Sequence, residues 1–139
     1  MSLPPPEPGL VFRYDYLWTR EARTGRTTGK ERPACIAVAA DSTAEPSLVI
    51  VLPITHSAPT GDAVGVEIPA AVRRALGLDS ERCWIVVTEA NVDEWPNAGI
   101  ALVPRSRKSF AYGFLPPDLY SVVKAMTLKH LDLRRAVRR

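Results

Sequence analysis

The chain has 139 residues, of which 46% are hydrophobic and 24% charged, and its formal net charge is +3. These values are typical of one soluble globular domain with a core of its own. No apolar run approaches the roughly 20 residues that cross a bilayer, and the proline-rich start lacks the regions of a secretory signal. We therefore expect a cytoplasmic protein with a flexible tail at 1–8 and a single domain over 9–139.

Strand patterns dominate the first half of the chain. A mixed apolar and polar segment predicts a strand at 10–14. Segment 15–31 predicts one long loop, because it has little apolar periodicity. The apolar runs 34–40 and 48–52 predict two buried strands, which would pair as a hairpin through residues 41–47.

A short helix interrupts the strands in the middle of the chain. Residues 64–68 predict a short strand, and residues 69–77 a helix with Pro69 in its first turn and Gly77 just beyond its end. The run 83–88 is rich in β-branched and aromatic residues and predicts a further strand.

The last third of the chain ends in the clearest helix pattern. We expect a loop at 91–97, short strands at 99–103 and 110–114, and a helix from Pro117 to Val137. The apolar stripe of this helix consists of Leu119, Val122, Val123, Met126, His130 and Leu133. The whole pattern predicts a mainly β protein, either a small barrel or a curled antiparallel sheet, with a short inserted helix and a long C-terminal helix.

Cysteine and histidine usage bears on cofactors. Cys35 and Cys83 each lie inside an apolar run, which favours buried free thiols. With two histidines and no CxxC motif, the sequence shows no zinc-type site. We therefore expect no metal and no cofactor.

Basic residues fall into two groups that offer phosphate-binding surfaces or solvated segments. For the C-terminal group we favour a solvated helix end, whereas both interpretations stay open for the first. The first group is Arg13, Arg20, Arg23, Arg26, Lys30 and Arg32; the C-terminal group is Lys124, Lys129, Arg134, Arg135, Arg138 and Arg139.

Polar residues stand where the two buried strands would meet. Arg32 begins one strand, and Thr55, His56 and Ser57 end the other, so a hairpin would place Arg32 beside Thr55. A guanidinium, a hydroxyl and an imidazole suit the binding and cleavage of a phosphodiester. Each also has an ordinary structural role at a strand end, and His56 can join Thr55 only if the chain turns between them. Glu89, which follows the 83–88 run, is either a base or a solvated strand-end carboxylate.

Three of these segments, taken in order, resemble one protein family. Pro8-Gly9-Leu10-Val11, the Arg32-Pro33 strand start and the Pro53-Ile54-Thr55 strand end are similar to the PemK/MazF family, the growth-inhibiting toxins of bacterial toxin–antitoxin pairs. The resemblance covers most of residues 8–130.

The resemblance implies an SH3-like barrel, a homodimer, a cognate antitoxin protein, and metal-independent endoribonuclease cleavage of single-stranded RNA. The family's active-site arginine falls on Arg32, its hydroxyl on Thr55, and an acid of some members near Glu89. The sequence departs from the family at two positions. Val87 stands where some members carry an arginine, and Leu10 stands where members usually carry an acidic residue.

The expected reaction is attack of a ribose 2′-OH on its adjacent phosphate. Arg32 would stabilise the developing charge, Thr55 would position the phosphate, and His56 or Glu89 would move protons. The expected RNA-binding residues are Arg20, Arg23, Arg26, Lys30 and Ser57.

Two other functions stay open. Segment 66–88 resembles AbrB/MazE-type DNA-binding domains, because an Ile-Pro pair precedes a short helix that ends in Leu-Gly-Leu. The Gly-Asp turn that usually follows in those domains is absent. The third possibility is a degenerate toxin, a barrel that binds RNA or protein without catalysis.

Overall fold

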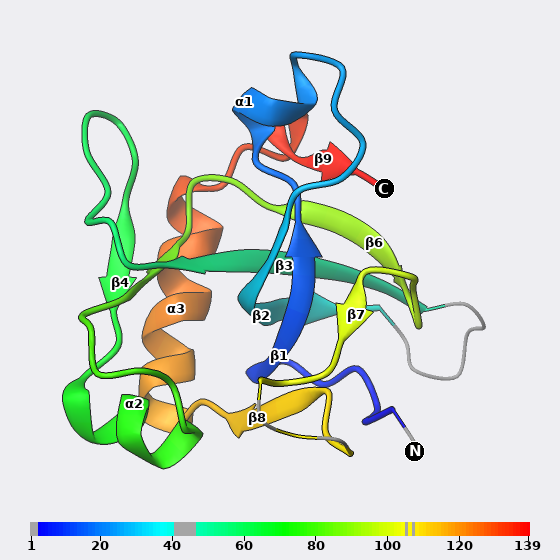
Figure 1. Ribbon diagram of the computed structural model, residues 1–139. Helices are drawn as coiled ribbons and strands as arrows, with labels where there is room; N and C mark the ends of the chain where they lie inside the picture. The colour runs from blue at the N-terminus through cyan, green and yellow to red at the C-terminus, as the bar shows by residue number, and fades with distance from the viewer. Residues whose placement is uncertain (1–2, 41–46, 105, 107) are drawn as a thin grey trace.

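The computed structural model describes residues 3–40, 47–104, 106 and 108–139 (Figure 1). Among these residues, no helix combines the length and apolar character needed to cross a membrane. The described ranges contain β1 (Leu10–Tyr16), α1 (Thr19–Ala22), β2 (Lys30–Ala39), β3 (Ser47–Thr55), β4 (Gly65–Glu67), α2 (Ala70–Leu76), β5 (Trp84–Val86), β6 (Asn91–Trp95), β7 (Ile100–Ala101), β8 (Ala111–Phe114), α3 (Pro117–His130), a 3-10 turn (Leu133–Arg135) and β9 (Val137–Arg138).

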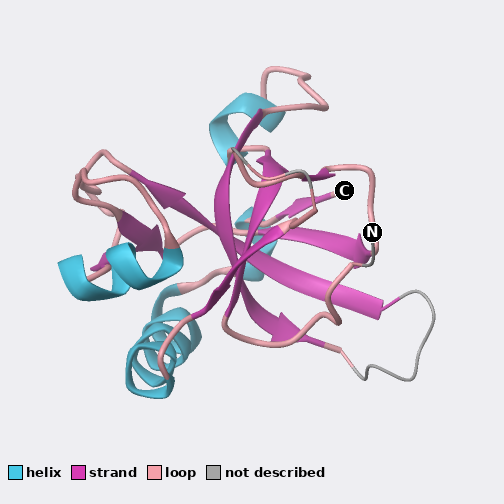
Figure 2. Cartoon of the chain, turned by 60° about the horizontal axis from the view of Figure 1, so that its bottom comes forward, coloured by secondary structure: helices cyan, strands magenta, loops and turns pink. Residues whose placement is uncertain are grey.

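The strands join in one sheet built around an antiparallel core of β1, β2 and β3. The outer side of β1 pairs with β7 and β8, and the outer side of β3 pairs with β5 and β6. Strand β4 pairs with the other side of β5 in antiparallel orientation, and β9 pairs with β6 in parallel. The mainly β class with a short inserted helix and a long C-terminal helix is confirmed, but these pairings do not close the described strands into a barrel. Figure 2 shows the helices at the periphery of the strands.

The sheet buries a different core on each face. On one face, α2 and α3 cover a cluster that includes Leu52, Ile85 and Val123. On the other, the alternate residues of β1 and the segment after it form an aromatic ladder, in which consecutive ring centroids lie 5.3–6.4 Å apart. The ladder consists of Phe12, Tyr14, Tyr16 and Trp18.

The predicted loop at 15–31 is wrong at both ends and in its middle. The inward alternation of the ladder carries β1 through Tyr16, and the Glu21 carboxylate accepts a hydrogen bond from the Trp18 N–H (3.2 Å) to begin α1. Gly29 allows a close approach, since a Cβ atom there would lie 1.9 Å from the Tyr16 carbonyl oxygen. Gly29 therefore allows its backbone to pack directly against the backbone at Tyr16.

The predicted loop at 91–97 is also wrong, because residues 91–95 form strand β6. Its inward side chains, Asn91, Asp93 and Trp95, are buried. Asp93 accepts a hydrogen bond from the Tyr14 hydroxyl (2.7 Å), and the Trp95 indole donates one to the Pro4 carbonyl (3.1 Å). The polar residues thus form a strand because distant partners satisfy their hydrogen-bonding groups. The contact between Trp95 and Pro4 ties part of the 1–8 tail to the domain.

The C-terminal helix ends at His130 and not near Val137. Leu131 is extended, and the Asp132 carboxylate accepts a hydrogen bond from the Arg134 N–H (3.0 Å), which begins the 3-10 turn. Within the apolar stripe, Val123 is fully buried, whereas Val122 is 49% exposed. The structure also shortens the predicted strands 83–88 and 99–103 to β5 and β7.

Both cysteines are buried free thiols, as predicted. The register of β2 and β3 confirms their antiparallel pairing, although residues 41–46 of the predicted turn lie outside the described residues. The helix at 69–77 is confirmed, with Gly77 at φ +70° just after Leu76.

The free energy of unfolding should fall in alkaline solution because the Cys35 thiol and the Tyr14 hydroxyl are buried in their protonated forms. Burial raises the pKa of Cys35 to about 12, and burial followed by the hydrogen bond to Asp93 raises the pKa of Tyr14 above its ordinary range. The unfolded chain releases these protons first, so the free energy of unfolding should decrease as the pH rises above about 9–10.

Urea unfolding from pH 8 to pH 11 measures this loss. Tyr14→Phe should flatten the decline above pH 10 by up to about 1.4 kcal/mol per pH unit, the value for one proton. Equal slopes for the wild type and the variant would show that Tyr14 ionises normally in the folded protein.

Candidate functional site

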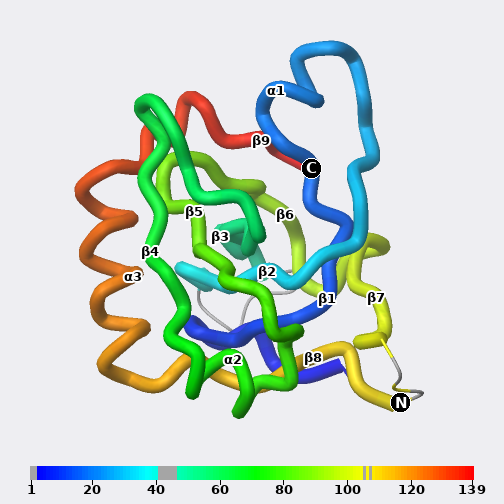
Figure 3. Tube along the Cα trace, turned by 60° about the vertical axis from the view of Figure 1, so that its left-hand side comes forward, coloured from blue at the N-terminus to red at the C-terminus, as the bar shows by residue number. Residues whose placement is uncertain are grey.

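A cleft of about 500 Å³ opens where β2 begins and β3 ends. Its lining comes from β1, from both of these strand ends, from the loop after α2, from the segment between β7 and β8, and from β8 itself. Figure 3 shows α2 near β8 at one end of the molecule and α1 near β9 at the other. The lining includes both apolar side chains and basic, acidic and hydroxyl groups.

The hairpin brings Arg32 and Thr55 to this cleft. Ala34 of β2 lies opposite Pro53 of β3, and two further residues along each strand lead to Arg32 and Thr55. Both residues line the cleft. Local strand pairing therefore produces the juxtaposition that the sequence predicts.

The Arg32 guanidinium is a cation without an acidic partner. Its Nε atom is buried without a hydrogen bond, and no ion pair to Arg32 occurs among the described residues. The guanidinium carbon lies 5.2 Å from the centroid of the Trp18 ring, a cation–π contact. Burial lowers the pKa of Arg32, but a guanidinium stays protonated in proteins. The buried Nε cannot reach a ligand, but the two terminal nitrogens donate no hydrogen bond within the described residues, so their donors remain for an anion in the cleft.

Thr55 supports the strand exit and keeps a donor. Its Oγ1 atom accepts a hydrogen bond from the Ser57 N–H (3.2 Å), the turn role that such a residue usually has. Because Oγ1 acts there as an acceptor, its own hydrogen remains available for a phosphate oxygen.

His56 reaches the cleft because the chain bends directly after Thr55. Its Nε2 atom lies 2.9 Å from the Asp79 carboxylate, and its Nδ1 atom lies 3.1 Å from the Arg82 carbonyl oxygen. The imidazole is thus oriented by the loop after α2. Asp79 itself lines the cleft and was not among the residues that the sequence singles out.

The same loop provides a possible ligand set for a cation. The ligand atoms of His56, Asp79 and Glu81 lie within 4.8 Å of one another, and all three residues are exposed. Within the described part of the chain, this is the group whose spacing suits a metal ion. The direct contact between the His56 ring and the Asp79 carboxylate accounts for the cluster equally well.

Glu89 does not line the cleft. Its carboxylate accepts hydrogen bonds from the Tyr16 hydroxyl and the Thr19 N–H, both at 3.1 Å. The structure therefore places Glu89 at the beginning of α1, where it satisfies a free backbone donor.

The expected RNA-binding residues separate into two sets. Lys30 lines the cleft. Arg20 lies over the Trp18 ring at 4.9 Å, and Arg26 pairs with Glu21 at 2.8 Å. The remaining two, Arg23 and Ser57, are exposed outside the cleft lining.

The sequence does not predict that two further cleft residues, Arg13 and Tyr112, lie next to each other. The Arg13 guanidinium donates a hydrogen bond from Nη1 to the Tyr112 hydroxyl (3.3 Å), and both residues line the cleft. Basic character and strand alternation mark Arg13 as outward-facing. Nothing local indicates that Tyr112, 99 positions away, lies beside it.

Comparison of the chain with protein-family models, curated proteins and solved structures found no match.

Proposed function

We propose that this protein is a metal-independent endoribonuclease that cleaves single-stranded RNA in the cleft between the start of β2 and the end of β3. The observation that carries the proposal is the unpaired Arg32 guanidinium, which shares the cleft with the Thr55 hydroxyl. A cation with free donors beside a hydroxyl suits a phosphodiester, whose two charged oxygens accept both kinds of hydrogen bond.

The proposed reaction forms a bond between the ribose 2′-oxygen and phosphorus and breaks the bond from phosphorus to the 5′-oxygen. Arg32 stabilises the charge that develops on the phosphate oxygens, and Thr55 holds one of them. His56 takes the 2′-hydroxyl proton and returns a proton to the leaving 5′-oxygen, which requires one ring nitrogen to leave its contact with Asp79 or with the Arg82 carbonyl oxygen when RNA binds. His56 is preferred to Glu89 for this role because only His56 lines the cleft.

In this proposal the protein is the toxin of a toxin–antitoxin pair in the cytoplasm. The support is the ordered resemblance to PemK/MazF proteins, in which Arg32 and Thr55 take the active-site positions, together with the β2–β3 pairing that brings both residues to the same cleft. The proposal includes a fold related to that family's SH3-like barrel, a homodimer, and an antitoxin with an acidic segment suited to the basic cleft.

The test is incubation of the purified protein with mixed-sequence single-stranded RNA in EDTA. We expect cleavage to products with 2′,3′-cyclic phosphate and 5′-hydroxyl ends. An oligonucleotide of the same sequence with 2′-deoxyribose throughout should stay intact, because it lacks the attacking hydroxyl. Cleavage of the deoxy strand, or products with other ends, would refute the mechanism.

Binding assays on the same preparation separate the alternatives. Binding of single-stranded RNA without cleavage would indicate a non-catalytic protein, and a preference for duplex DNA would indicate the DNA-binding function of segment 66–88. In the structure, β4 pairs with β5, and β5 pairs with β3 inside the common sheet. This integration favours a structural role for the segment.

A further inference from the structure

The wall formed by Arg13 and Tyr112 takes no part in the proposed chemistry. Arg13 comes from β1 and Tyr112 from β8, and both line the cleft that holds Arg32 and Thr55. The wall is therefore built next to the proposed phosphate position by strands that the Arg32 hairpin does not include.

Arg13 is held in place and still has free donors. Its side chain is 22% exposed, and its Nε atom is buried without a hydrogen bond. The Glu31 carboxylate lies 3.9 Å from Nε and forms an ion pair with Arg13, at a distance too long for a hydrogen bond. The contact with the Tyr112 hydroxyl fixes the guanidinium in the cleft.

Apolar residues also border this pair, beside the Glu31 carboxylate. Pro33 lies opposite Arg13 in the β1–β2 register, and Val103 and Pro104 line the same cleft. Tyr112 is half-buried. An aromatic ring and a guanidinium plane are groups on which a nucleobase stacks. A purely phosphate-binding site would need none of the apolar groups.

We propose that the Arg13–Tyr112 wall is a nucleobase subsite that holds the base next to the scissile phosphate. This inference rests on the proposed function for the identity of the polymer. It assigns Tyr112 to the base and Arg13 to both the base and its phosphate, so the two residues should affect ligands with and without a base differently.

The experiment compares the binding of a nucleoside monophosphate with that of ribose 5-phosphate, which lacks the base, by NMR titration. Stacking contributes about 1–3 kcal/mol per base, so the wild type should bind the nucleotide about 10-fold more tightly. Tyr112→Ala should remove this preference, whereas Tyr112→Phe should keep it. Arg13→Ala should weaken both ligands.

The matched control is Phe114→Ala, which removes a 50% exposed ring from the same strand outside the cleft lining and should leave both affinities unchanged. Contacts between the base protons and the Tyr112 ring, measured on the wild type, provide a test that needs no variant. Equal wild-type binding of both ligands, or a preference that survives Tyr112→Ala, would overturn the subsite. Because no cleavage is measured, failure of the endoribonuclease proposal remains distinguishable.

Discussion

Replacing Arg32 with alanine should lower the rate of RNA cleavage by about 100-fold or more, the usual cost of removing one donor to a developing oxyanion. The guanidinium has no acidic partner among the described residues, so its removal leaves no buried carboxylate unpaired. The folded protein should therefore survive the change, and the loss should appear mainly in kcat.

Lys124→Ala is the matched control. It removes one positive charge from the exposed side of α3, away from the cleft lining, and should cleave RNA at the wild-type rate. Arg32→Lys should recover only part of the activity, because an ammonium group cannot form the paired hydrogen bonds of a guanidinium. Equal cleavage by the wild type and Arg32→Ala would contradict the assigned role.

Local signals predict those parts of the fold whose partners are near in sequence. Pro69 and Gly77 delimit α2 because the conformational limits of proline and glycine act at their own positions. The juxtaposition of Arg32 and Thr55 follows from one hairpin, so the centre of the candidate site could be predicted as well.

Parts of the fold with remote partners could not be predicted in this way. Asn91 and Asp93 suggest a loop by composition, yet they lie in a strand because β1 and the residues after it satisfy their polar atoms. The second wall of the cleft likewise depends on the contact between Arg13 and Tyr112. Their strands, β1 and β8, are neighbours in the sheet but far apart in the sequence. No local pattern encodes such a register.

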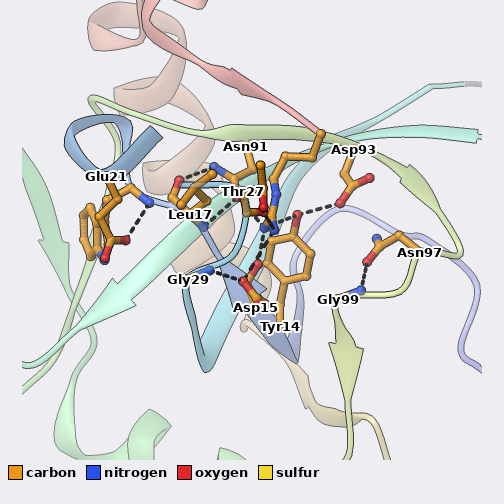
Figure 4. Close-up of polar contacts among 12 residues, drawn as sticks. Tyr14, Asp15, Leu17, Glu21, Thr27, Gly29, Asn91, Asp93, Asn97 and Gly99 are labelled. Carbon is orange, nitrogen blue, oxygen red and sulfur yellow. Dashed lines mark hydrogen bonds and ion pairs between the residues drawn. The ribbon is translucent and has the colours of Figure 1, made fainter. Parts of the chain in front are cut away.

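The buried amide of Asn91 connects three distant segments. Its Oδ1 atom accepts a hydrogen bond from the Leu17 N–H (3.0 Å), and its Nδ2 atom donates one to the Leu17 carbonyl (2.7 Å) (Figure 4). The guanidinium of Arg139, only 14% exposed, also donates to Oδ1 (3.2 Å) and to the Thr27 carbonyl (3.0 Å). The amide therefore holds β6 against the residue after β1, and Arg139 links it to the segment that leads into β2.

Asn91→Ala should accordingly lower the free energy of unfolding by about 3–5 kcal/mol, because it leaves buried backbone groups of Leu17 without partners. Asn97→Ala is a stringent control, since Asn97 also makes two backbone hydrogen bonds, one with Gly99 (Figure 4) and one with Glu94, but is half-exposed. Water can replace those bonds, so the expected loss is about 1 kcal/mol. Urea unfolding with linear extrapolation measures both values. Similar losses for the two variants would show that the Leu17 groups find other partners, and that the connection through Asn91 contributes little to the stability of the sheet.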